Sequence, residues 1–199
     1  METTTQSGAT YLPLADMTVP IYTIGYGTLS TDQFLAALRP YKIQFLIDVR
    51  SRPYSRFRPE FSRESIKAVL QKARVRYVYM GDLLGGQPED PQCYDSEGRV
   101  DYAVFQATQS YQHGISRLRT AHTKSLLVCL MCSEEQPENC HRSKLIGHSL
   151  EATEIEVRHI LPNGDWLSQD AVIHRVTGGQ ASMFGLTLKS RKSYRGPGQ

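Results

Sequence analysis

The chain has 199 residues, of which 40% are hydrophobic and 22% are charged, and its formal net charge is +3. This is the composition of an ordinary globular protein, and the length suits one domain that buries its own core. An apolar run of about 18 or more residues is missing, which excludes a transmembrane helix. The N-terminal residues also lack the basic start and apolar stretch of a secretory signal. We therefore expect a cytoplasmic protein without membrane association, whose four cysteines are reduced.

The two ends of the chain are expected to be disordered, with a single α/β domain at residues 20–188 between them. Residues 1–19 form a Thr- and Ser-rich arm without a pattern, and residues 189–199 form a basic tail. Basic residues also gather at 50–76, where nine Lys or Arg stand beside only two acidic residues. A local basic surface indicates an anionic partner, although the same charges fit a solvated helix face equally well.

Strand and helix patterns alternate along the middle of the chain. Short apolar or β-branched runs predict strands at 21–25, 44–50, 75–80, 125–132 and 154–160. Capping residues and apolar spacing predict helices after Ser30, after Ser62, from Asp101 onward and from about His141 to Ala152. Residues 165–188 are ambiguous, with 171–177 a candidate edge strand. We predict an α/β fold, a three-layer sandwich around a mainly parallel sheet of about five strands, with 125–132 near its centre.

Chemically distinctive residues follow the ends of the predicted strands. Ligands of open α/β sheets bind at the carboxyl ends of the strands, so this coincidence predicts a site there. The candidate anion-binding residues are Gly25, Tyr26, Gly27, Arg50, Arg52, Arg56 and Arg142. The candidate catalytic residues are Asp48, Cys132, Glu134, Cys140 and His141.

Several of these residues have a structural interpretation as well as a functional one. Alternation along the strand puts Asp48 and Arg50 on the face opposite Val49, so they can form an ion pair, or Arg50 can clamp an anion. The glycines at 25–27 let backbone N–H groups approach a phosphate, or they form a plain tight turn. The Arg- and aromatic-rich segment 51–61 fits phosphate contacts with base stacking, or an ordered loop whose rings enter the core.

The segment 132–142, CSEEQPENCHR, carries the strongest chemical signal. Cys140 lies at a predicted helix start beside His141 and Arg142, a setting that lowers a thiol pKa, so we predict it to be the reactive thiol. Glu134 is a candidate for proton transfer. Zinc ligands usually come as C-x(2–4)-C, and the one pair with that spacing, Cys129 and Cys132, would point to opposite faces of a strand. We therefore assign no metal ligands, although the spacing leaves a metal open as the less favoured alternative, and the cofactor is unknown. Cys129 is placed in the core.

Four segments together resemble the family catalogued as domain of unknown function 488. They are TIGYGTLSTDQFLAAL, FLIDVRSRPYSRF, VRYVYMGDLLGG and LMCSEEQPENCHRSKLIGHSL, within residues 21–165. The resemblance implies an α/β fold and a cytoplasmic setting, and it names no reaction. The family's motif positions correspond here to Gly25, Asp48, Arg50, Arg56, Gly85, Gly86, Cys132, Glu134, Pro137, Cys140, His141 and Arg142.

Three functions remain open. The first is an enzyme, a hydrolase or transferase, acting on a phosphate-bearing substrate such as a nucleotide, nucleoside derivative or nucleic-acid component. There Arg50 and Arg142 bind the anion, Glu134 or His141 moves the proton, and Cys140 or Cys132 is a nucleophile or a structural support. The second is a non-catalytic nucleic-acid-binding module that uses residues 50–76. The third is an interaction scaffold whose motif residues maintain the fold. The convergence at one sheet edge favours the enzyme.

Overall fold

The protein is described by a computed structural model that covers residues 19–179 and 188–194. Most of the predicted N-terminal arm and the last five residues lie outside the described residues. The strands are β1 (Ile21–Gly25), β2 (Phe45–Asp48), β3 (Arg76–Tyr79), β4 (Arg99–Asp101), β5 (Val128–Cys132), β6 (Val157–Ile160), β7 (Trp166–Ser168) and β8 (Lys189–Ser193). The helices are α1 (Thr31–Leu38), α2 (Arg63–Lys72), α3 (Gly81–Leu84), α4 (Tyr102–Gln106), α5 (Gln109–Thr123), α6 (His148–Glu151) and α7 (Gln169–Thr177), with a π-helical segment at Arg142–Gly147.

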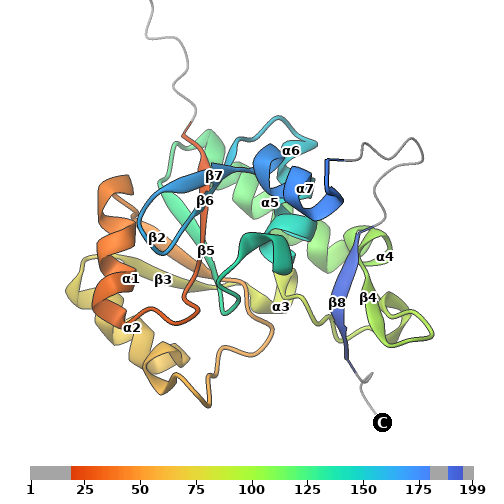
Figure 1. Cartoon of the computed structure of the whole chain (residues 1–199), viewed down its shortest axis with the longest axis horizontal. Helices are drawn as coiled ribbons and strands as arrows, with labels where there is room; N and C mark the ends of the chain where they lie inside the picture. Colours follow the sequence, from red (N-terminus) through yellow and green to blue (C-terminus); the bar gives the residue numbers. More distant parts are fainter. Residues whose placement is uncertain (1–18, 180–187, 195–199) are drawn as a thin grey trace, which may run out of the picture.

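The central sheet has six strands in the order β3-β2-β5-β1-β6-β7 (Figure 1). The first five are parallel, and β7 pairs antiparallel with β6 at the edge. All five predicted strands are present, and β5 lies between β2 and β1, which explains why its residues are the most hydrophobic. The α/β prediction with a mostly parallel sheet is therefore confirmed, with β7 as an addition that makes the sheet mixed.

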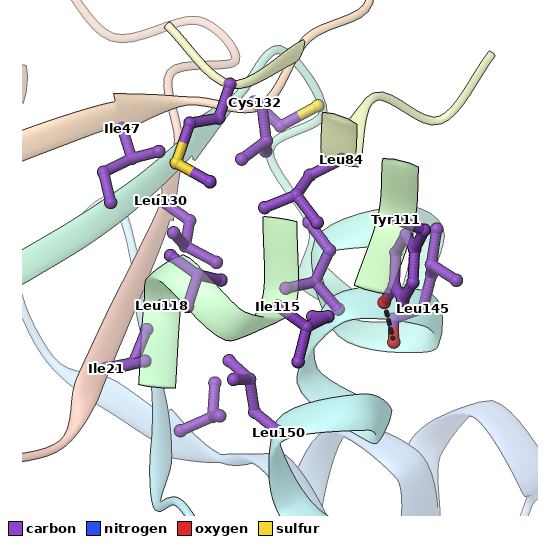
Figure 2. Packing of buried hydrophobic residues seen from close by; sticks show 14 of the residues in the cluster. Ile21, Ile47, Leu84, Tyr111, Ile115, Leu118, Leu130, Cys132, Leu145 and Leu150 are labelled. Carbon is purple, nitrogen blue, oxygen red and sulfur yellow. Dashed lines mark hydrogen bonds between the residues drawn. The ribbon is translucent and has the colours of Figure 1, made fainter. Parts of the chain in front are cut away.

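Helices cover both faces of the sheet, so the domain has three layers (Figure 1). One face packs on α1 and α2 through a cluster that includes Phe34 and Leu70. The other packs on α5, α6 and the π-helical segment, and its cluster includes Leu118 and Leu145. Figure 2 shows this second cluster with Cys132 at one border and Leu150 toward the other, so β5 leads from the apolar interior to the edge of the sheet.

The predicted long helix that starts at Asp101 is two helices. The Asp101 carboxylate accepts hydrogen bonds from the backbone N–H groups of Ala103 and Val104, which begins α4 as expected. The Thr108 hydroxyl then accepts from the N–H of Tyr111 and begins α5. An N-capping side chain inside the apolar pattern therefore divides the helix.

Residues 171–177, the candidate edge strand, belong to helix α7 instead. The Ser168 hydroxyl caps its first turn through the N–H of Ala171, and Gly178 ends it with a left-handed backbone, φ 62°. Both residues are standard helix boundaries. The apolar run AVIHRV between them therefore follows the helical period and not the alternation of a strand.

Part of the predicted disordered tail is also ordered. Residues Lys189–Ser193 form β8, which pairs antiparallel with β4 in a separate two-stranded sheet. Val100 of β4 donates its N–H to the Ser190 hydroxyl at 2.8 Å, and Lys189 forms an ion pair with Asp95 at 3.0 Å. These contacts hold residues 189–193 of the basic C-terminal segment against the α/β domain. Among the described residues, every helix is too short or too polar to cross a membrane.

Candidate functional site

A pocket of about 210 Å³ lies at the carboxyl edge of the sheet, where β1, β2 and β5 end. It is lined by seven of the twelve residues predicted from the sequence, which are Tyr26, Arg50, Arg52, Cys132, Glu134, Cys140 and His141. The remaining lining residues come from the loops after β2 and β5, from residues 86–87, from Tyr102 and from the C-terminal segment 190–194. The location is the one that the open α/β architecture predicts.

Four cations line this pocket, and two of them come from the C-terminal strand. Arg50 and Arg52 follow β2, while Arg191 and Lys192 belong to β8. The carboxylate of Glu134, in the loop after β5, forms ion pairs with both cations of β8. Its oxygens lie 3.3 Å from Lys192 Nζ and 3.6 Å from Arg191 Nη2. Among the lining residues one carboxylate therefore stands beside four cations, and the charge of one of these, Arg50, is balanced by Asp48.

Arg50 and Asp48 form a closed ion pair beneath the pocket. The Asp48 side chain is fully buried, and its oxygens accept from Arg50 Nη2 at 2.6 Å and Nε at 2.9 Å. Arg50 Nη2 also donates to the Phe61 carbonyl at 2.9 Å, and the Tyr77 hydroxyl donates to Asp48 at 2.7 Å. Burial alone would lower the pKa of Arg50, but its bonds with Asp48 raise it above its ordinary value. The predicted placement of both residues opposite Val49 is confirmed, and the geometry fits the structural interpretation of Asp48.

Arg142 has a structural position that the sequence did not predict. It is fully buried and does not line the pocket; its guanidinium donates to the backbone carbonyls of Glu134 and Glu135. Gly25 leaves room for this clamp, because a Cβ there would lie 1.8 Å from the Glu134 carbonyl oxygen and 2.3 Å from Arg142 Nη1. The loop after β5 is therefore held in place from below.

Three other predicted residues also lie outside the pocket lining. Gly25 and Gly27 support the loop after β5, since a Cβ on Gly27 would lie 2.5 Å from the Glu135 side chain. Arg56 is exposed beside the ring of Phe57. A residue that sequence analysis overlooked, Arg58, donates to the carbonyls of Gly27 and Leu29 and ties the Arg-rich loop to the end of β1.

Cys132, Cys140 and His141 meet at one end of the pocket. His141 Nδ1 lies 3.8 Å from Cys132 Sγ and 3.7 Å from Cys140 Sγ. His141 Nε2 is 3.0 Å from the carbonyl oxygen of Val49. A carbonyl only accepts, so Nε2 carries the proton, and in the neutral ring the lone pair of Nδ1 faces both sulfurs.

The two thiols of this cluster differ in acidity. The hydrogen bond from Cys140 holds the pKa of Cys132 well below its usual range, with His141 adding to the effect. Burial raises the pKa of Cys140 well above its usual range, and the neighbouring Cys132 raises it further. Which of the two thiols reacts stays a prediction: the directions of these pKa shifts favour Cys132, whereas the sequence pattern favoured Cys140. Cys129 lies in the opposite core cluster, as predicted, and its burial raises its pKa.

The pocket residues missed from the sequence are mainly Arg191 and Lys192 of β8 and Tyr194, which follows this strand. Their only signal was the positive charge of the tail, which does not reveal where the tail lies. Tyr54 and Phe57 settle part of the question left open about the Arg-rich loop: they are 72% and 89% exposed, whereas Phe61 is buried in the core.

A family model described as "Domain of unknown function DUF488" matches residues 30–148, which is more than half of the chain. The chain therefore belongs to this family, as the resemblance in its motifs indicated. Significant matches to curated proteins or to solved structures were not found. The family description names no reaction, so function is argued from the site.

Proposed function

As a member of the DUF488 family the chain carries no named reaction, and we propose from its own site that it is an enzyme acting on a phosphate-bearing substrate at the carboxyl edge of the sheet. The observation that carries the proposal is the pocket in which four cations face the Cys132–Cys140–His141 cluster. Anion recognition and a chemically reactive group then share one small cavity, which is the arrangement that a group-transfer or hydrolytic enzyme needs.

The chemistry of the pocket supports a division of roles. Arg52, Arg191 and Lys192 bind the anion, because their charges are exposed enough to exchange water for a ligand. Arg50 contributes field and shape, since most of its donors are already used by Asp48 and Phe61. Glu134, held beside the two cations of β8, is the group that moves a proton. The substrate class we favour is a nucleotide or nucleoside derivative, because the exposed ring of Tyr54 also lines the pocket and offers a stacking surface.

The first test is a thermal-shift screen of the purified protein against inorganic phosphate, nucleoside monophosphates, nucleosides and ribose 5-phosphate. A ligand at a hundred times its dissociation constant adds about 2.7 kcal/mol to the free energy of unfolding, which gives a visible rise in Tm. We expect the phosphorylated compounds to stabilise the protein and the nucleosides to have little effect. Each stabilising compound is then incubated with the protein, and its conversion is followed by liquid chromatography.

Two arginines on the same loop provide a matched pair for this screen. Arg52 lines the pocket and Arg56 does not, while both are exposed. The Arg52→Ala variant should lose the stabilisation by phosphate compounds, and the Arg56→Ala variant should keep it. Arg50→Ala is a poor choice, because it leaves the buried charge of Asp48 unpaired. Equal behaviour of the two variants, or no stabilisation by any phosphate compound, would refute the proposal.

The alternative is a non-catalytic nucleic-acid-binding module, and the exposed rings of Tyr54 and Phe57 favour it. They stand beside Arg52 and Arg56, and α2 adds the exposed cations of Arg63 and Lys67. Such a surface binds single strands by stacking and charge, so its affinity falls steeply with salt. Binding of a short single-stranded oligonucleotide that is lost in Phe57→Ala and in Arg56→Ala, without turnover of any small compound, would favour this alternative.

A further inference from the structure

Among the described residues, Cys132, Cys140 and His141 are the one group of three metal-ligating side chains whose donor atoms all lie within 4.8 Å of one another. Three segments of the chain hold the cluster in place. Cys132 ends β5, Cys140 follows the loop that Arg142 clamps, and the ring of His141 reaches the carbonyl after β2. We propose that these three side chains bind a transition-metal ion, zinc in particular, and that the fourth coordination position faces the pocket.

The distances within the cluster fit such an ion. Zinc bonds of about 2.3 Å to sulfur and about 2.0 Å to nitrogen, at tetrahedral angles, place the two donor atoms about 3.5 Å apart. The separations here are 3.8 Å and 3.7 Å from His141 Nδ1 to the two sulfurs. An inward shift of a few tenths of an ångström therefore brings the nitrogen to the required separation from each sulfur, and the two sulfurs lie within 4.8 Å of each other.

The hydrogen bonds around the three donor atoms also favour metal binding. His141 Nε2–H donates a hydrogen bond to the Val49 carbonyl, which fixes the ring and leaves the lone pair on Nδ1. Histidines that bind metals almost always have such a partner for the second nitrogen. The Arg142 backbone N–H lies 3.5 Å from Cys140 Sγ and supports negative charge on that sulfur. Gly86 lies against the His141 ring, where a Cβ would come within 2.9 Å of the Cγ atom.

The donor set selects the kind of metal. Two sulfurs and one imidazole nitrogen suit zinc and other borderline or soft ions, whereas magnesium and calcium take oxygen ligands. Three protein ligands with a fourth position left for water or substrate are typical of catalytic rather than structural zinc sites. Cys132, Cys140 and His141 all line the pocket, so that fourth position opens toward Arg52 and the cations of β8. An anionic substrate drawn in by those cations would meet the metal directly.

The metal site also explains the seven-residue gap that separates Cys132 from Cys140. In the C-x(2–4)-C pattern the local turn itself brings the two sulfurs together. Here the loop of residues 133–139 does so, and it is held by the guanidinium of Arg142 and by the bond from Thr28 to Glu135. The ligands are therefore assembled by tertiary structure, which is why their spacing carries no familiar signal.

The test measures metal content and does not depend on any substrate. Full-length protein is purified with reductant, stripped with chelator, incubated with zinc sulfate, desalted and assayed by mass spectrometry for zinc per chain. We expect an equimolar amount in the wild type. With Co²⁺ instead, we expect thiolate-to-cobalt charge-transfer absorption and the intense visible bands of tetrahedral coordination. Failure of the wild type to retain zinc, or a cobalt spectrum without thiolate absorption, would overturn the proposal.

Matched variants assign the ligands. Cys132→Ser and His141→Gln should each weaken zinc binding by more than the 10- to 100-fold, roughly, that loss of an outer hydrogen-bond partner costs. Cys129→Ser, three positions earlier on the opposite face of β5, should retain zinc. Retention of zinc at wild-type affinity by both Cys132→Ser and His141→Gln would overturn the assignment.

A measurement on the wild type covers the case in which the ligand variants do not fold. Bound zinc should protect Cys132 and Cys140 from iodoacetamide, read peptide by peptide, and equal labelling with and without zinc would contradict the proposal. So would a Cys132–Cys140 disulfide in protein kept under reductant. The proposal goes beyond the proposed function and can fail separately: Arg52→Ala should lose phosphate compounds yet keep its zinc.

Discussion

The carboxyl edge of the sheet carries two groups of polar side chains, one on each face, and they differ in how many of their members line the pocket. On the α1–α2 face, Asp48, Arg50 and Tyr77 form a closed network with hydrogen bonds of 2.6–2.9 Å between side chains. On the α5 face, Cys132, Cys140 and His141 are separated by 3.7 Å or more from nitrogen to sulfur. Asp48 and Tyr77 do not line the pocket, so this network supports the edge of the sheet, whereas all three members of the cluster line the pocket and can meet a ligand there.

The largest effect that this comparison predicts is the loss of Asp48. Asp48→Ala leaves the Arg50 charge buried and unpaired, which should lower the free energy of unfolding by about 3–5 kcal/mol in urea titrations. The double variant Asp48→Leu with Arg50→Leu removes both charges and should be destabilised less than Asp48→Ala. If the single substitution costs under about 1 kcal/mol, the network is not the closed support described here.

A second prediction concerns His159. This histidine is fully buried, whereas His141 is partly exposed and lines the pocket. Its Nδ1 lies 2.7 Å from Thr23 Oγ1 and its Nε2 lies 2.8 Å from Gln169 Oε1. Burial lowers the pKa of His159 from its usual 6.5 to about 4. Between these two pH values the histidine is protonated in the unfolded chain and neutral in the folded chain. Its contribution to the free energy of unfolding is therefore complete above pH 6.5 and is lost as the pH falls toward 4.

The size of that effect is about 3 kcal/mol over the full window. It is measured as the difference between the free energies of unfolding at pH 7 and pH 4, in the wild type and in His159→Gln. The variant cannot titrate there, so its pH dependence should be smaller by roughly that amount. An identical pH dependence in both proteins would show that His159 is not held neutral by the fold.

The smallest predicted effect compares two tyrosines on β3. The Tyr77 hydroxyl donates to the Asp48 carboxylate at 2.7 Å, and the Tyr79 hydroxyl donates to the Ser51 carbonyl at 2.9 Å. Hydrogen bonds to charged acceptors are stronger, so Tyr77→Phe should cost about 1–2 kcal/mol and Tyr79→Phe about half of that. Equal costs in chemical denaturation would mean that Asp48 gains nothing from its third partner.

The parts of the structure that the sequence predicted well are those set by local pattern. The five parallel strands follow from apolar runs, and the Ser30–Gln33 capping box begins α1 as expected. Convergence of polar residues at the carboxyl edge then follows from the topology, because parallel strands end on the same side. That reasoning placed seven predicted residues in the pocket.

The remaining features depend on contacts between distant segments. Arg142 looked like an anion ligand because it stands beside Cys140, but the cradle of carbonyls that binds it exists only after the loop at 133–139 folds back. The approach of Cys132 and Cys140 to the ring of His141 also depends on tertiary structure. Tail residues such as Lys192 reach the pocket through pairing of β8 with β4, a match that no local propensity encodes.

Because β8 pairs with β4, two separate stretches of the chain supply the residues that line the pocket. The reactive cluster lies inside residues 30–148, the part that matches the family, whereas Arg191 and Lys192 lie well beyond it. Two of the four cations that line the pocket therefore come from a segment outside the matched residues, and the other two, Arg50 and Arg52, lie within them. Exchanging residues 189–194 for another strand that pairs with β4 would therefore change the charge of one wall of the pocket while leaving the cysteines and His141 untouched.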